Sequence, residues 1–89
     1  MADISVTPAG GGEFTVEVAG GGTRTTHRVT VPAGTAADLG VDPALLVEES
    51  FRFLLEREPK ESILNSFDLA VIARYFPEYP DEIRRRLES

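Results

Sequence analysis

Apolar and polar residues alternate strictly along two segments in the first third of the chain, 13–18 and 23–31. Each segment follows a run of three glycines, and period-two alternation bounded by glycines is typical of a half-buried β-hairpin. The segment 3–7 also alternates and is a candidate third strand, which would make residues 1–31 a β-meander. The residues that share the apolar face of the hairpin are Phe14, Val16 and Val18, then Thr25, His27, Val29 and Val31.

A four-residue loop at 19–22 predicts how the two hairpin strands are paired. In this register Glu17 faces Arg24, and Glu13 faces Arg28. Both acid–base pairs then lie on the solvent face, where opposite charges across antiparallel strands contribute about 0.2–1 kcal/mol each. The charge pattern therefore supports the hairpin.

The pattern becomes helical after a connector at 32–41. Asp42 followed by proline predicts a helix start, because a carboxylate caps the free N–H groups and proline suits the first helical position. We expect a helix at 43–58. Its apolar residues cover about 200° of the circumference, twice the roughly 100° stripe that one packing surface requires. Val47, Phe51, Leu54 and Leu55 form the face expected to lie on the sheet, and the adjacent stripe consists of Leu46 and Phe53.

The remaining elements are expected to be short. A turn of helix is predicted near 59–65, a third helix capped by Ser66 or Asp68 ends at Pro77, and a last helix occupies 80–87. Strands followed by helices predict an α+β fold, in which a small antiparallel sheet carries three to four short helices on one face. At 89 residues the chain is expected to be a single domain, 1–89, with its helical part at 42–89.

Composition narrows the classes of function. The net charge of −6 argues against a polyanion as main ligand and against an anionic membrane surface. The chain has no cysteine, which excludes disulfides and thiolate metal sites. It shows neither a signal-peptide pattern nor an apolar run of about 20 residues, so we expect a cytoplasmic protein without a membrane anchor.

No group of residues matches a known pattern for a catalytic site or a cofactor-binding site. His27 is the single histidine, and in the predicted register it lies across from Phe14, where a core role is expected. Glu56, Glu58 and Glu61 are interleaved with basic residues, which is typical of a solvated helix end. Neither glycine run has the Lys-Ser/Thr of a phosphate-binding loop. We therefore expect no catalytic residue, no metal and no cofactor.

Nucleic-acid binding is the alternative function, and it depends on arginines. The candidates are Arg24 and Arg28 on the hairpin and the run Arg84, Arg85 and Arg86 near the end of the chain. However, acids stand four residues before Arg85 and Arg86, and such pairs stabilise a helix by themselves. The hairpin arginines face glutamates in the predicted register, so a nucleic-acid partner is the weaker hypothesis.

Six of the seven aromatic residues fall between positions 51 and 79. Among them, Tyr75-Phe76-Pro77 and Glu78-Tyr79-Pro80 pair aromatic residues with prolines. Such rigid groups suit a binding surface, and they suit equally the packing of a helix connection onto the core. Both interpretations remain open from the sequence.

The segment FLLEREPKESILNSFDLAVIARYFPEY, residues 53–79, resembles one found in short uncharacterised bacterial proteins. The resemblance covers about a third of the chain and implies no activity and no functional residues. The leading hypothesis is therefore built from the residues: a non-enzymatic protein–protein interaction or regulatory module. It is expected to form a homodimer through the second stripe of the 43–58 helix or to bind a protein partner. The candidate interaction residues are Leu46, Phe53, Tyr75, Phe76 and Tyr79.

Overall fold

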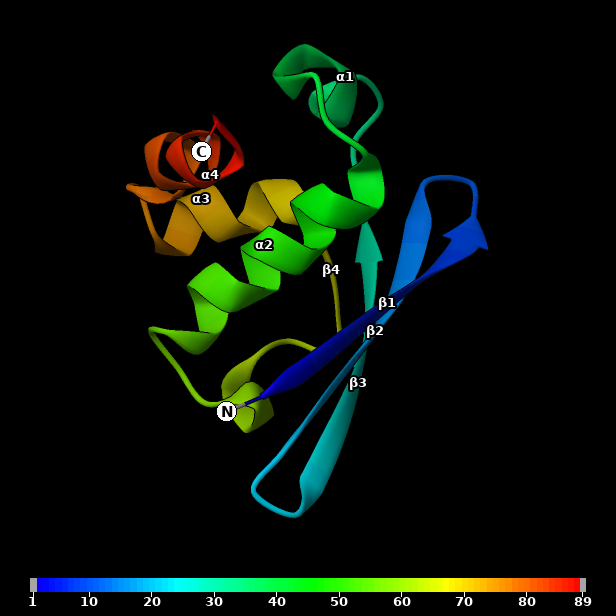
Figure 1. Cartoon of the computed structure of the whole chain (residues 1–89), viewed down its shortest axis with the longest axis vertical. Helices are drawn as coiled ribbons and strands as arrows, with labels where there is room; N and C mark the ends of the chain where they lie inside the picture. The colour runs from blue at the N-terminus through cyan, green and yellow to red at the C-terminus, as the bar shows by residue number, and fades with distance from the viewer. Residues whose placement is uncertain (1, 89) are drawn as a thin grey trace.

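A computed structural model describes residues 2–88. It shows a four-stranded sheet with the strand order β1-β2-β3-β4 and its helices gathered on one side (Figure 1). The predicted α+β fold is confirmed. The elements are β1 (Asp3–Gly10), β2 (Glu13–Gly20), β3 (Thr23–Thr30), α1 (Thr35–Leu39), α2 (Pro43–Leu55), a 3-10 turn (Lys60–Ser62), β4 (Ser66–Asp68), a second 3-10 turn (Leu69–Val71), α3 (Ile72–Tyr75) and α4 (Tyr79–Glu88).

The turn between β2 and β3 corrects the predicted register. Gly21 and Gly22 have φ angles of 61° and 82°, and a two-residue hairpin turn favours such left-handed conformations. The loop therefore has two residues rather than four, and the pairing moves by two positions. Glu17 faces Thr26 instead of Arg24.

The shift leaves the two faces of the hairpin unchanged, because side chains alternate with a period of two. Val16, Val18, His27 and Val29 are buried on the inner face, as the alternation predicted. The candidate strand at 3–7 is also confirmed. It forms the longer strand β1, which pairs antiparallel with β2 along the edge of the sheet.

The start of α2 is as predicted, whereas its end comes earlier. Asp42 Oδ1 accepts a hydrogen bond of 2.8 Å from the Ala44 N–H, and Pro43 is the first helical residue. The helix ends at Leu55 and not at Glu58. The pyrrolidine ring of Pro59 disfavours the helical conformation of the residue before it, so the chain leaves the helix ahead of the proline.

The second apolar stripe of α2 is covered within the same chain. Leu46 and Phe53 are 1% and 0% exposed. The helix α4 packs against α2 and brings Tyr79 and Ile83, both buried, to the shared core. The stripe that was expected to contact a second copy of the chain is therefore covered inside the chain, because Phe76 and the ten-residue helix α4 pack against it.

Two elements differ from the sequence-based expectation. The connector contains the short helix α1, and the predicted third helix begins instead with the strand β4, which pairs in parallel with β3. The open edge of β3 explains the strand, because Arg28 N–H donates a 2.7 Å hydrogen bond to the Asn65 carbonyl. Asp68 is a cap as expected, and its Oδ1 accepts from the Ala70 N–H at 2.8 Å.

Candidate functional site

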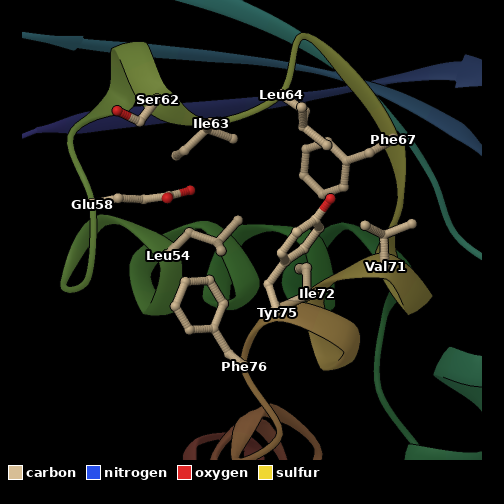
Figure 2. Close-up of a pocket in the computed structure, with 10 residues that line it drawn as sticks. All are labelled: Leu54, Glu58, Ser62, Ile63, Leu64, Phe67, Val71, Ile72, Tyr75 and Phe76. Carbon is tan, nitrogen blue, oxygen red and sulfur yellow. The ribbon is translucent and has the colours of Figure 1, made fainter.

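A hollow of about 360 Å³ opens between the C-terminal end of α2, the loop 59–65, β4 and α3 (Figure 2). We call it the α2–α3 groove. Its volume lies near the lower end of the roughly 300–1,000 Å³ typical of ligand sites. The residues that line it are mostly apolar: Leu54, Glu58, Ser62, Ile63, Leu64, Phe67, Val71, Ile72, Tyr75 and Phe76.

The groove has a buried apolar floor and an exposed apolar rim. Leu54, Ile63 and Ile72 are all buried, so the floor is continuous with the core. Leu64 and Tyr75 on the rim are 50% and 68% exposed. Figure 2 shows the Tyr75 ring extending across the groove, with its hydroxyl toward the Leu64 side. The groove can therefore accept apolar groups without a rearrangement of the core.

Glu58 is the charged residue of the groove. Its side chain is half-buried, and its carboxylate points inward between Leu54 and Ile63 (Figure 2). No hydrogen bond or ion pair joins this carboxylate to another residue within 2–88. The neighbouring basic residues are engaged elsewhere, since Arg57 pairs with Glu78 at 3.1 Å and Lys60 with Glu61 at 3.2 Å.

His27 holds one wall of the groove against the sheet. Its Nδ1 lies 2.8 Å from the Leu64 carbonyl oxygen, and since a carbonyl only accepts, Nδ1 donates this bond. Its Nε2 lies 2.9 Å from the Thr25 hydroxyl. The buried ring also contacts Phe51 at a centroid distance of 5.3 Å. The expected position across from Phe14 is corrected, because His27 faces Val16.

The candidate interaction residues divide into two groups. Tyr75 and Phe76 line the groove, whereas Leu46, Phe53 and Tyr79 lie in the core. The Phe53 ring meets Phe76 and Tyr79 edge-on, at centroid distances of 5.8 Å and 5.3 Å. Tyr79 therefore packs internally, as one interpretation of the aromatic–proline motif predicted, whereas Tyr75 is exposed and its role in binding stays a prediction.

Sequence reasoning missed Leu64, Phe67 and Glu58 as members of one site. Leu64 and Phe67 belong to no periodic apolar stripe, and β4 was not predicted. Glu58 was interpreted as part of a solvated helix end. The apolar pair Ile63-Leu64 inside the predicted turn is the one signal that could have pointed to an exposed apolar rim.

Tyr79 and Ser50 form a buried polar contact between α4 and α2. The Ser50 hydroxyl donates to the Leu46 carbonyl at 2.7 Å, so Tyr79 donates its own hydrogen to Ser50 Oγ at 2.6 Å. Burial raises the pKa of Tyr79. The phenol is therefore more difficult to ionise in the folded chain.

This contact predicts a loss of stability at alkaline pH. Above the ordinary tyrosine pKa of 10.0, the unfolded chain loses the Tyr79 proton while the folded chain keeps it. The free energy of unfolding should therefore fall as pH rises from about 10 toward the folded pKa. Denaturant unfolding at a series of pH values measures this fall. Tyr79→Phe should cost about 1 kcal/mol at neutral pH and show a smaller alkaline fall than Tyr75→Phe. Equal falls in the two variants would contradict the assignment.

The candidate nucleic-acid residues are not gathered on one surface. Arg24 and Arg28 lie on the outer face of the sheet, because they alternate with inward residues of β3. The other arginines belong to α4 on the helical side of the sheet (Figure 1). Arg86 binds Glu56 at 2.6 Å, and this bond lowers the pKa of Glu56. Arg85 lies 3.7 Å from Glu82.

Comparisons with protein-family models, with curated proteins and with solved structures found no match. Within residues 2–88, no three histidine or carboxylate side chains come together in a way that could hold a metal ion. The same residues form no helix with the length and apolar character needed to cross a membrane. Any function of the groove must therefore be inferred from its geometry.

Proposed function

We propose that the protein is a non-enzymatic binding module that holds a segment of a partner protein in the α2–α3 groove. The supporting observation is the position of its exposed apolar side chains. Among the described residues, three large apolar side chains are exposed, and two of them, Leu64 and Tyr75, form the rim of this groove. Exposed apolar surface around a concave site is typical of interaction sites.

The groove replaces the second stripe of α2 as the proposed interaction surface. Leu46 and Phe53 are buried under α4, so they offer no surface to a partner in this conformation. Tyr75 suits the role, because tyrosine is enriched among residues that dominate binding energy. The arrangement of the arginines gives less support to the nucleic-acid alternative, since ion pairs already engage three of the five, Arg28, Arg85 and Arg86.

A pair of matched substitutions tests this proposal. Leu64→Asp places a charge on the rim, whereas Leu45→Asp places one at a comparably exposed leucine of α2, which is 43% exposed and lies outside the groove. Protein captured from the source cells on wild-type and variant baits is quantified by mass spectrometry. We expect a partner that the Leu45 variant retains and that binds the Leu64 variant at least about tenfold more weakly, because the aspartate would be covered without a partner charge.

Size-exclusion chromatography with light scattering identifies the case in which the partner is a second copy of the chain. A dimer that Leu64→Asp dissociates and Leu45→Asp preserves would place the self-contact in the groove. Captured proteins that bind both variants equally, together with an unchanged oligomeric state, would contradict the proposal.

A further inference from the structure

We infer that the groove takes a protein segment in which a lysine or arginine stands among apolar residues, with the cationic end at Glu58. This inference rests on the proposed function and adds the chemistry of the partner. The apolar rim and floor define one part of the occupant, and the carboxylate inside the groove defines the other.

The Glu58 carboxylate carries the argument. It is half-buried between the apolar side chains of Leu54 and Ile63, and it has no partner within residues 2–88. The carboxylate oxygens keep some contact with water in the free protein. An occupant that covers them must replace that water, and a cation does so through a charge-assisted hydrogen bond. An occupant that is apolar throughout would instead cover the carboxylate and make its position less favourable.

The cations nearest in the chain are already held by other groups. Arg57 donates to the carboxylate of Glu78 at 3.1 Å and to the Phe53 carbonyl at 3.2 Å, and its guanidinium lies 3.6 Å from the centre of the Phe53 ring. Lys60 donates to the Gly20 carbonyl at 2.9 Å. An internal rearrangement that pairs Glu58 would have to break these contacts, so the free carboxylate is available to a partner.

The shape of the groove suits a long basic side chain. The carbon stem of lysine or arginine packs on apolar surface while its charged end reaches a polar group. Leu54 and Ile63 provide that surface beside Glu58, and the rings of Phe67 and Tyr75 lie farther along the groove for an apolar neighbour (Figure 2). A single ammonium compound would fill one end of the groove, whereas a peptide segment also covers the rim.

The overall charge favours the same class of partner. The net charge of −6 repels acidic segments and attracts basic ones. Such fields increase association rates and penalise partners of the wrong sign. Both the local carboxylate and the charge of the whole chain therefore favour a basic, apolar segment.

A random peptide library displayed on phage and selected on the wild-type protein is the test. Synthetic copies of the enriched peptides are then titrated against wild-type, Glu58→Gln, Leu64→Asp and a matched control, Glu17→Gln, which removes a carboxylate on the outer face of the sheet. We expect enrichment of basic residues among apolar ones. Glu58→Gln should weaken binding about tenfold, as for a hydrogen bond to a charged group, and Glu17→Gln should leave it unchanged.

Replacing the peptide's basic residue with norleucine should abolish the advantage of wild-type over Glu58→Gln, because an apolar side chain offers the carboxylate no partner. Peptides that need Leu64 but neither Glu58 nor a basic residue would overturn this inference and leave the proposed function standing. Peptides that bind Leu64→Asp as well as wild-type, or a selection without any enrichment, would overturn both.

Discussion

Replacing Phe53 with alanine is expected to lower the free energy of unfolding by about 3–5 kcal/mol. The Phe53 ring is 0% exposed and lies among Phe76, Tyr79 and the Arg57 guanidinium. Its removal leaves a cavity where α2 and α4 meet and deprives three neighbours of their contact. Domains typically have only about 5–15 kcal/mol of stability in total. The variant should therefore be close to the limit of folding at room temperature.

Denaturant unfolding of Phe53→Ala and of the control Leu45→Ala measures this loss. The control removes an exposed side chain from the same helix, and we expect a change within about 0.5 kcal/mol. Light scattering gives the oligomeric state of both variants. If Phe53 instead formed a dimer contact, its variant would dissociate a dimer and keep the stability of the monomer, which would contradict the packing described above.

Replacing His27 with alanine is expected to cost about 3 kcal/mol. The loss combines a cavity next to Phe51 with two polar groups, the Leu64 carbonyl and the Thr25 hydroxyl, that lose a hydrogen-bond partner. The change should also loosen the groove, because the carbonyl belongs to a residue of its rim. A substitution inside the sheet is therefore expected to weaken partner binding at a groove that the substituted residue does not line.

His27→Leu separates the two effects, because leucine keeps apolar bulk and removes the hydrogen bonds. Amide hydrogen exchange measured by NMR is the local readout. The Arg28 N–H, which donates to the Asn65 carbonyl, should exchange faster in this variant, whereas amides in the β1–β2 pairing should keep their protection. Equal acceleration in both places would mean that His27 supports the whole sheet and not this wall in particular.

The elements that local patterns predict well are those that local forces determine. The alternation in β2 and β3 and the Asp42-Pro43 start of α2 depend on residues close in sequence, and the structure confirms them. The predicted register of the hairpin was wrong because the glycine run between β2 and β3 does not determine how many residues form the loop. Shifts of two residues preserve every face, so burial alone did not separate the two registers.

The features that the sequence did not predict depend on contacts with residues far along the chain. The strand β4 has three residues, and it forms because it pairs with the edge of β3 that β2 leaves open. The cover of Leu46 and Phe53 comes from α4, which the sequence predicted as a helix without indicating where it docks. The groove depends on the first of these placements, because Phe67 of β4 lines it. Tyr75 and Phe76 were identified from the aromatic–proline motif, whereas Leu64 and Glu58 were not identified.

The parallel pairing of β3 with β4 also sets an order of assembly. A hairpin with a two-residue turn closes within about 1–10 μs, because its contacts are local. The wall of the groove requires His27 to meet the Leu64 carbonyl 37 positions away, with α2 already in place between them along the chain. Long-range contacts of this kind form later. During synthesis the sheet can therefore be complete through β3 before any docking site exists, so binding competence reports that the chain has folded at least through Phe76, the last residue that lines the groove.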